Sequence, residues 1–325
     1  MHHFILVPFN GNGTASTNNY RTASPIPSSS ATTPMAPSST SDLISTSTFT
    51  YTSDIDALQY QANTFTNTSG SIAVYRVTLR DGGSSSDADA NPTTIQQLVF
   101  RGTNLNQLRG AVLSNGNSII SGAGVIDSTG NTITFSSLNI SAADNGSYDI
   151  TLRVSFWNKV IDNVQLGFSL LANDVLVSSA GSQLAAFTQV SSSTLNNRNR
   201  IEVTATQLAW RQQPLGAGIN IAMIPQPKVS TIDVEGNLDL DGLGIVSIAS
   251  TGTMDSSSKS RNLIAGTATF ENIRFTASQS NITLTASMAG YGSVVSNPFQ
   301  VSTFPTNSYR TANTGTTEAH TNAPK

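Results

Sequence analysis

The residues best suited to chemistry are the acidic side chains of one Gly- and Ser-rich segment, RDGGSSSDADANPT. This segment contains Asp81, Asp87 and Asp89, and Asn91 follows two residues after the last of them. Calcium takes about six to eight oxygen ligands, and carboxylates two residues apart on a glycine-rich loop can converge on one ion together with backbone carbonyl groups. The segment therefore predicts a calcium site that stiffens a loop. The alternative is a solvated hairpin loop that is polar because it is exposed.

A second acidic segment, DVEGNLDLDG, is a weaker candidate for metal binding. Asn237, Asp239 and Asp241 precede Gly242 in an order like the start of an EF-hand loop. However, Ile248 stands where the bidentate Glu of such a loop would be, and strand-like patterns flank the segment on both sides. We therefore expect a polar turn here rather than an EF-hand.

The remaining titratable residues do not predict an enzyme. The histidines, His2, His3 and His320, all lie near the ends of the chain, and there is no cysteine. A Ser-His-Asp triad or a histidine-based zinc site is therefore not expected in the folded body. The 19 Asp and Glu residues leave open the carboxylate pair of a glycoside hydrolase, but their spacing selects no pair. We assign no catalytic residue.

The charge balance argues against nucleic acid as a partner. Sixteen Lys and Arg stand against 19 Asp and Glu, giving a formal charge of −3, and no basic cluster is present. Binding to phosphate groups needs concentrated positive charge. Charged residues make up 11% of the chain, less than half the ordinary ~25%. Clear apolar runs nevertheless predict a folded body with polar, uncharged surfaces.

The elements that must position these side chains are strands. In SYDITLRVSF, one face carries Tyr148 to Phe156 at every second position, which predicts a half-buried strand. The following run, DNVQLGFSLL, repeats the pattern, so the two strands either pair or lie close in one sandwich. Similar short runs separated by Gly, Asn, Asp and Ser recur along the chain, and no window shows helical spacing: SIAVYRVTLR, QQLVF, TITFSSLNI, RIEVTATQLAW, GIVSIAST, GTATFENIRFTA and ITLTASM. The chain is therefore expected to be all-β.

One turn before a strand carries a fold-level motif. In DNGSYDI, Asp144, Gly146 and Tyr148 match the D-x-G-x-Y-x-C pattern of immunoglobulin domains, with Ile150 at the cysteine position. This pattern predicts a tyrosine corner, in which the tyrosine hydroxyl bonds back to the backbone of the preceding loop. The alternative is an ordinary Asn-Gly turn before a strand that begins with tyrosine.

Composition divides the chain into two tandem immunoglobulin-like β-sandwich domains with low-complexity tails. We expect a Ser/Thr/Pro-rich tail or linker over residues 1–42 and a polar tail over 303–325, because such stretches bury too little surface to offset their ordering entropy. The larger sandwich is expected over residues 43–203. The smaller one, over 204–302, has the ~100-residue size of an immunoglobulin-like domain. The apolar run near the N-terminus, Phe4 to Phe9, is too short for a secretory signal or a membrane span, so we expect any export signal outside this chain.

Several of these segments resemble a known group of modules. VYRVTLRDGGSSSDADANPTTIQQLVF, FSSLNISAADNGSYDITLRVSF and NNRNRIEVTATQLAW resemble β-rich repeats in very large surface and secreted proteins of gliding, type IX-secreting bacteria. TIDVEGNLDLDG, followed by AGTATFENIRFTA, is similar to the bacterial immunoglobulin-like modules that often follow them. The resemblance covers Phe49 to Val301 and departs at Asn281 to Leu284, where those modules carry a tyrosine. It implies spacers, stalks or adhesive surfaces on or outside the cell, without catalytic residues.

The sequence thus predicts a structural or adhesive segment of a large extracellular repeat protein. Its partners would be neighbouring copies or domains of the same long chain, or surface glycans and proteins, and self-assembly through strand edges stays open. The words TNNYRTAS and TNSYRTAN, near the two ends of the chain, fit either a long repeat period or two similar linkers. The first alternative function is a pair of carbohydrate-binding modules, for which Trp157, expected to point outward, and Trp210, expected between the domains, are the aromatic candidates. The second is a hydrolase with a carboxylate pair.

Overall fold

A computed structural model describes residues 38–256 and 259–303 in full. Nearer the N-terminus it describes the backbone of four short strands, which pair as β1 with β4 and β2 with β3: β1 (His2–Ile5), β2 (Phe9–Asn10), β3 (Asn19–Tyr20) and β4 (Ser28–Ala31). Most of both predicted tails, the C-terminal YRTA word and His320 lie outside the described residues, as do the side chains of His2 and His3.

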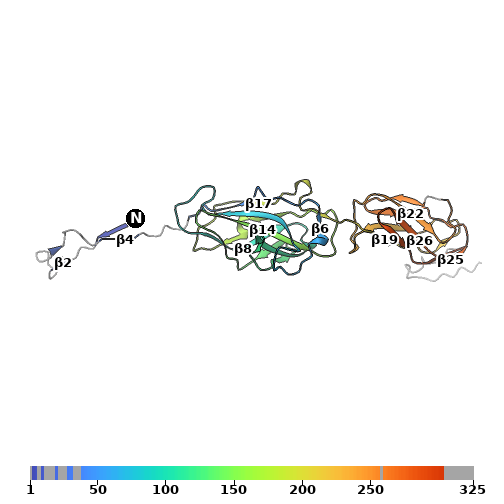
Figure 1. Cartoon of the computed structure of the whole chain (residues 1–325), viewed down its shortest axis with the longest axis horizontal. Helices are drawn as coiled ribbons and strands as arrows, with labels where there is room; N and C mark the ends of the chain where they lie inside the picture. Colours follow the sequence, from blue (N-terminus) through green and yellow to red (C-terminus); the bar gives the residue numbers. More distant parts are fainter. Residues whose placement is uncertain are drawn as a thin grey trace, which may run out of the picture.

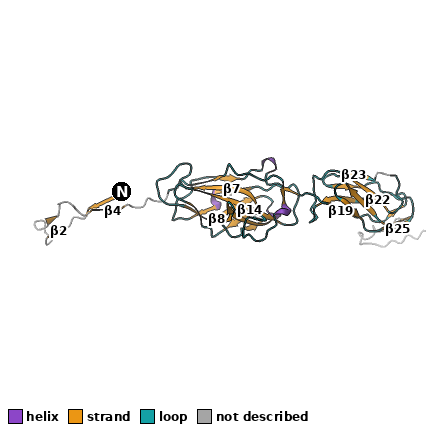
Figure 2. Cartoon of the chain, in the orientation of Figure 1, coloured by secondary structure: helices purple, strands orange, loops and turns teal. Residues whose placement is uncertain are grey.

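The described chain consists of strands, turns and four 3-10 helices of three residues each, η1 (Ala57–Gln59), η2 (Leu105–Gln107), η3 (Ala172–Asp174) and η4 (Leu195–Asn197). Figure 2 shows strands throughout both folded bodies. The all-β expectation is confirmed. Two separate hydrophobic cores divide the described chain into a larger sandwich, with buried residues from Leu43 to Ile201, and a smaller sandwich, with buried residues from Leu208 to Val301.

Two sheets form the larger sandwich. In the first sheet the strand order is β10-β9-β14-β7-β5. The strands of this sheet are β5 (Asp42–Ser45), β7 (Ile72–Arg80), β9 (Leu108–Asn115), β10 (Ser118–Ile119) and β14 (Ser147–Phe156). The second sheet has the order β11-β12-β8-β15-β17, and β13 and β16 also pair with β8. Its strands are β8 (Thr93–Gly102), β11 (Val125–Asp127), β12 (Thr132–Phe135), β13 (Ile140–Ala142), β15 (Phe168–Leu171), β16 (Val175–Val177) and β17 (Gln189–Ser191).

The predicted strand from Tyr148 to Phe156 forms β14, the centre of the first sheet. It pairs antiparallel with β7 on one side and with β9 on the other. Ile150, Leu152, Val154 and Phe156 are fully buried. The next predicted strand is shorter than expected and forms β15 in the opposite sheet. Of the two alternatives, pairing is therefore wrong, and the two strands face each other across one core.

Aromatic side chains from both sheets fill the centre of the larger sandwich. The rings of Tyr75 and Phe100 meet edge to face with centroids 6.3 Å apart, and those of Phe100 and Phe135 do so at 6.0 Å. The three are almost completely buried. Because each buried ring removes a large apolar area from water, this cluster is a main source of stability for the sandwich.

The smaller sandwich is built from three short sheets around its own core. Their strand orders are β19-β21-β24, β23-β22-β26-β27 and β20-β28-β25. The strands are β19 (Gln207–Gln212), β20 (Ala217–Gly218), β21 (Lys228–Ile232), β22 (Ile245–Ser250), β23 (Ser260–Asn262), β24 (Thr267–Thr269), β25 (Gln279–Ile282), β26 (Leu284–Met288), β27 (Gly292–Val295) and β28 (Phe299–Ser302). Phe275 and Phe299 pack edge to face inside it, with ring centroids 5.5 Å apart.

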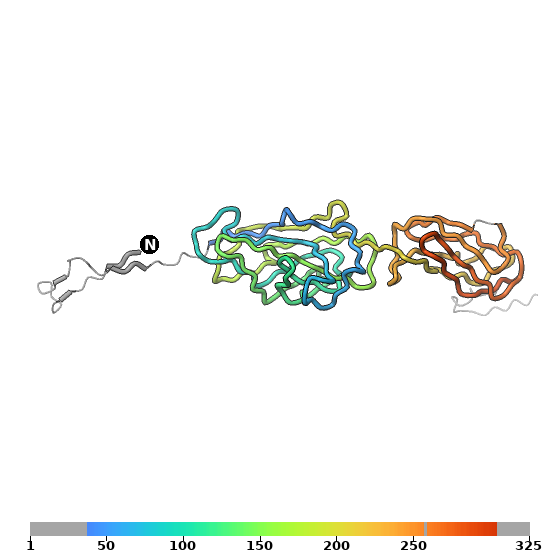
Figure 3. Tube along the Cα trace, viewed as in Figure 1, coloured from blue at the N-terminus to red at the C-terminus, as the bar shows by residue number. Residues whose placement is uncertain are grey.

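The two sandwiches lie end to end along the long axis of the molecule (Figure 1). The Cα trace crosses from one to the other just after β18 (Ile201–Glu202), which pairs in parallel with β6 (Ile55–Asp56) (Figure 3). Side chains and backbone also join them. Asn237 Nδ2 donates to the carbonyl oxygen of Asn158 at 2.9 Å, and its Oδ1 accepts from the backbone N–H of Val160 at 3.2 Å. The loop after β14 is therefore tied to the loop after β21.

Candidate functional site

The predicted acidic loop lies between β7 and β8, at one end of the larger sandwich. One carboxylate oxygen each from Asp81, Asp87 and Asp144 lies within 4.8 Å of the others. Asp81 follows β7 directly, and Asp144 lies in the turn before β14. The register that pairs Arg80 with Ser147 brings these two segments together. The structure thus adds Asp144, predicted as part of a tyrosine corner, to two of the three predicted calcium ligands.

Asp89, the third predicted ligand, does not belong to this group. Its Oδ1 accepts from the backbone N–H of Asn91 at 2.6 Å, and its Oδ2 from that of Ser38 at 2.5 Å. The hydroxyl of Ser182 also donates to it. The hydrogen bond from Asn91 is the main cause that lowers the pKa of the Asp89 carboxyl. Asp89 therefore fastens the segment before β5 to the loop instead of facing Asp81 and Asp87.

Hydrogen bonds also satisfy most of the Asp81 group. Asp81 is 3% exposed; its Oδ1 accepts from the hydroxyls of Thr93 and Ser41, and its Oδ2 accepts from the backbone N–H of Asn145 at 2.9 Å. Asp87 Oδ2 accepts from the hydroxyl of Ser38, whereas its Oδ1 is buried and has no hydrogen-bond partner in the described part of the chain. These hydrogen bonds give both oxygens of the buried Asp81 carboxylate partners without a metal. A calcium ion at this loop stays a prediction.

The turn before β14 has no tyrosine corner among the described residues. Asn145 adopts a left-handed φ of 55°, and the backbone N–H of Gly146 donates to the carbonyl oxygen of Ala143 at 2.7 Å. Tyr148 is half-buried and packs against the core, but no hydrogen bond joins its hydroxyl to the preceding loop, all of which the structure describes. The alternative, an Asn-Gly turn before a strand that begins with tyrosine, is the one found. The buried tyrosine with a bonded hydroxyl is Tyr75, whose Oη lies 2.8 Å from Ser45 Oγ.

A second acidic group lies where the two sandwiches meet. One carboxylate oxygen each from Asp162, Asp239 and Asp241 lies within 4.8 Å of the others. Asp162 comes from the loop after β14 in the larger sandwich, whereas Asp239 and Asp241 come from the loop after β21 in the smaller one. From the sequence, Asp239 and Asp241 were expected in a polar turn rather than an EF-hand. No sequence motif around Asp162 indicated a site. The group forms because the fold brings two distant loops together, so the sequence alone could not show it.

The electrostatics of this junction favour cations. Arg200 pairs with Asp54 at 2.8 Å and with Glu202 at 3.0 Å. Burial, followed by the negative charges of Asp241 and Asp162, raises the pKa of Glu202 to about 7. Burial is the largest cause, and the smaller contributions of Asp241 and Asp162 place two further carboxylates near Glu202.

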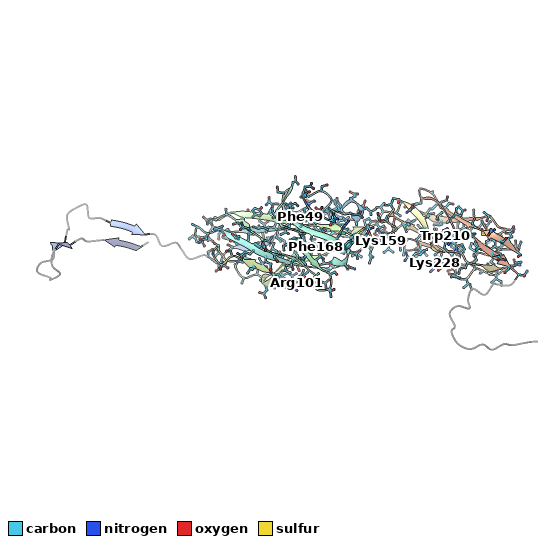
Figure 4. All side chains as sticks on the ribbon, turned by 90° about the horizontal axis from the view of Figure 1, so that it is seen from below. Phe49, Arg101, Lys159, Phe168, Trp210 and Lys228 are labelled. Atoms are coloured by element: carbon cyan, nitrogen blue, oxygen red, sulfur yellow. The ribbon has the colours of Figure 1, made fainter. Side chains whose placement is uncertain are left out.

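The two tryptophans differ in exposure. Trp157 is 48% exposed and lines a surface hollow of about 370 Å³ together with Arg109, whose guanidinium lies 5.8 Å from the centre of the indole ring. Its expected outward orientation is confirmed. Trp210 is half-buried and packs against the core of the smaller sandwich, where Figure 4 shows it. It is therefore not a packing residue between the two sandwiches.

A hollow of about 660 Å³ lies on the smaller sandwich and is mostly basic. Its charged residues are Arg211, Lys228, Arg261 and Glu271. Its lining includes one carboxylate, so it does not offer the pair that a glycoside hydrolase uses.

Comparisons with solved structures give matches at low identity and low TM-score. No family model and no curated protein sequence matches the chain. A glycosyl hydrolase family 2 member from Bacteroides cellulosilyticus aligns at 9% identity and a TM-score of 0.25, over 81% of this chain and 28% of that one. The fibronectin(III)-like modules of Clostridium thermocellum CbhA align at 9% identity and a TM-score of 0.18, over 80% of this chain and 92% of theirs.

The tandem Ig repeats of Dlar align at 12% identity and a TM-score of 0.18, over 65% of this chain and 97% of theirs. This chain spans 28% of the length of the glycosyl hydrolase. TM-scores this low carry no argument about activity or partners. In the described part of the chain, no helix has the length and apolar character needed to cross a membrane.

Proposed function

We propose that this chain is a structural segment of a longer extracellular protein, in which two β-sandwiches in line hold other domains away from a surface or adhere to a partner. The observation that supports this proposal best is the end-to-end arrangement of two separate cores (Figure 1). A stalk needs units that each fold around their own core and a connection that limits bending. The hydrogen bonds of Asn237 with Asn158 and Val160 act at that connection.

The finer parts of the proposal rest on the sequence. The resemblance of the β-rich segments to repeats of gliding, type IX-secreting bacteria favours a cell-surface or secreted location. The low charged fraction, 11%, favours a surface without strong electrostatic partners. Partners are then neighbouring domains or copies of the same long chain, or surface glycans and proteins.

Force spectroscopy of the chain, placed between marker domains, tests the mechanical role. We expect two unfolding events with contour-length gains of about 55 and 35 nm, at the ~3.6 Å per residue of an extended chain. Both sandwiches should withstand forces comparable to those of the markers. Extension without resolved force peaks would contradict a load-bearing role.

A carbohydrate-binding module is the second candidate, and the exposed ring of Trp157 favours it. Tryptophan rings stack on sugar faces, and the hollow beside Trp157 adds the guanidinium of Arg109 as a hydrogen-bond donor. A glycan array with the chain and its Trp157→Ala variant tests this candidate. Binding that the variant loses would establish it, and an array without signal for either protein would remove it.

A further inference from the structure

We propose that Asp162, Asp239 and Asp241 bind one calcium ion between the two sandwiches. The proposal does not depend on the proposed function, because it concerns only the chemistry of the junction. It differs from the calcium site predicted at Asp81, Asp87 and Asp89, which lies in a different loop of the larger sandwich.

One carboxylate oxygen of this group is buried without a hydrogen-bond partner in the described part of the chain. Asp239 is 6% exposed, and its Oδ2 accepts from the backbone N–H of Ala205 at 3.1 Å. Its Oδ1 is also buried but has no hydrogen-bond partner in the described part of the chain. A buried charged oxygen without a partner is costly, so native proteins supply a hydrogen bond, a countercharge or a metal. The other two carboxylates of the group lie next to this oxygen.

The spacing of the three carboxylates fits one calcium ion. The three carboxylate oxygens lie within 4.8 Å of one another. Calcium–oxygen distances are about 2.3–2.6 Å, so oxygens on opposite sides of one ion are at most about 5 Å apart. The side chain of Asp241 is 51% exposed, which leaves room for water to complete the shell. Calcium accepts such irregular oxygen shells, whereas magnesium demands a near-ideal octahedron.

Among the described residues, Arg200 is the cation paired with this group, and that pair is long. Its nearest nitrogen lies 3.9 Å from Asp241, beyond hydrogen-bond distance, and Arg200 is shared with Asp54 at 2.8 Å and Glu202 at 3.0 Å. Lys159 lies at the junction (Figure 4), but among the described residues no ion pair joins it to any of the three acids. Burial and the nearby Asp241 raise the pKa of Asp239. A shared proton is therefore the competing way to relieve the repulsion, and it predicts no binding of calcium.

The hydrogen bonds of the group show why an ion here would act on the joint. Asp162 Oδ1 accepts from the backbone N–H of Val203, and its Oδ2 from that of Leu240, both at 2.7 Å. The three ligands are thus anchored to the larger sandwich, the connecting segment and the smaller sandwich. An ion bound to all three would add a link across the junction and restrict bending between the sandwiches.

Calorimetric titration of the chelator-treated full chain with calcium chloride tests the site. Titration should reach several millimolar, so that a weak site with a dissociation constant of about 10⁻⁴–10⁻³ M is also detected. Asp241→Asn is the main variant, since Asp241 is exposed and accepts no backbone hydrogen bond within the described residues. We expect it to weaken calcium binding at least about tenfold, because it removes a charged ligand. Asp87→Asn, in the other acidic group, is the matched control and should keep the junction affinity.

The outcomes separate the alternatives. Absence of binding, or binding that Asp241→Asn leaves unchanged, overturns the proposal, and equal affinity for magnesium chloride overturns the assignment of calcium. If Asp241→Asn fails to fold, Asp239→Asn carries the same test. The absence of cysteine allows spin labels at Ser128→Cys and Ser293→Cys, one exposed position on each sandwich. Calcium should narrow the distance distribution between these labels, and an unchanged distribution overturns the placement of the ion between the sandwiches.

Discussion

At the scale of the residue, two tyrosines of the larger sandwich differ in what their hydroxyls contact. Tyr75 is fully buried, and its hydroxyl lies 2.8 Å from Ser45 Oγ, whereas Tyr148 is half-buried and has no such bond within the described residues. We expect Tyr75→Phe to lower the free energy of unfolding by roughly 0.5–1.5 kcal/mol through the lost hydrogen bond. Tyr148→Phe should leave it almost unchanged. Urea midpoints of the two variants check this difference, and a larger loss for Tyr148→Phe would restore the tyrosine corner.

The acidic residues show how far single positions could be predicted. Asp81 and Asp87 stand in one loop, so their proximity was visible in the sequence. Asp144 lies beside them because β14 pairs with β7. Asp89 lies apart from them because Ser38, Asn91 and Ser182 donate hydrogen bonds to it. Both facts depend on tertiary contacts. Closeness in sequence therefore predicted the pair Asp81 and Asp87, but it failed for Asp89, and it could not predict a site assembled from several loops.

At the scale of the element, the loop after β7 depends on its glycines. Gly83 has a φ of 72°, and a Cβ atom there would lie 2.4 Å from the carbonyl oxygen of Thr40. For comparison, Gly116, in the turn between β9 and β10, has a φ of 53° and open space around it. The left-handed conformation alone costs a non-glycine residue about 1–2 kcal/mol, so we expect that loss for Gly116→Ala. Gly83→Ala should cost clearly more, because the backbone must also move. Chemical denaturation of both variants provides the comparison, and equal losses would contradict the steric argument.

Strands with one buried face were predictable, while others were not. The apolar and polar residues alternate in the sequences of β14 and β7 and mark the core-facing side chains, although Thr151 and Ser155 on the other face of β14 are also buried. β9 was not predicted, because four consecutive residues from Ala111 to Ser114 are buried on both faces, so no period of two is visible. β15 proved shorter than its pattern, since Leu166 is buried from a loop instead of from a strand. An alternating pattern thus locates strands that bury one face, and it fails where both faces are buried or where a loop residue is buried.

At the scale of the whole molecule, the all-β class followed from short strands and polar turns. How the sandwiches meet did not follow, because that depends on loops after β14 and β21 that share no sequence pattern. Asn237 and Asp162, which join those loops, appear as ordinary polar turn residues in the sequence. Their role depends on which backbone groups the fold brings within reach.

Separate cores imply separate unfolding. Phe135 belongs to the core of the larger sandwich and Phe275 to that of the smaller one, and both are almost fully buried. Phe→Ala in a core costs about 3–5 kcal/mol through lost burial and the cavity left behind. We expect Phe135→Ala to lower one thermal transition in a calorimetric scan and Phe275→Ala to lower the other, each leaving its partner transition in place.

The contacts at the junction determine how independently the two sandwiches unfold. If its hydrogen bonds couple the sandwiches strongly, both variants would shift a single common transition, and the description as two separately folding units would be wrong. Asn237→Ala is the matched variant, because it removes the bonds to Asn158 and Val160 without entering either core, although it also removes the bond from Asn237 Nδ2 to Asp233 Oδ2 within the smaller sandwich. We expect the two thermal transitions of this variant to be less coupled than those of the unmodified chain. The free energy of unfolding of each sandwich should fall by no more than the roughly 1–3 kcal/mol expected for buried polar groups left unpaired.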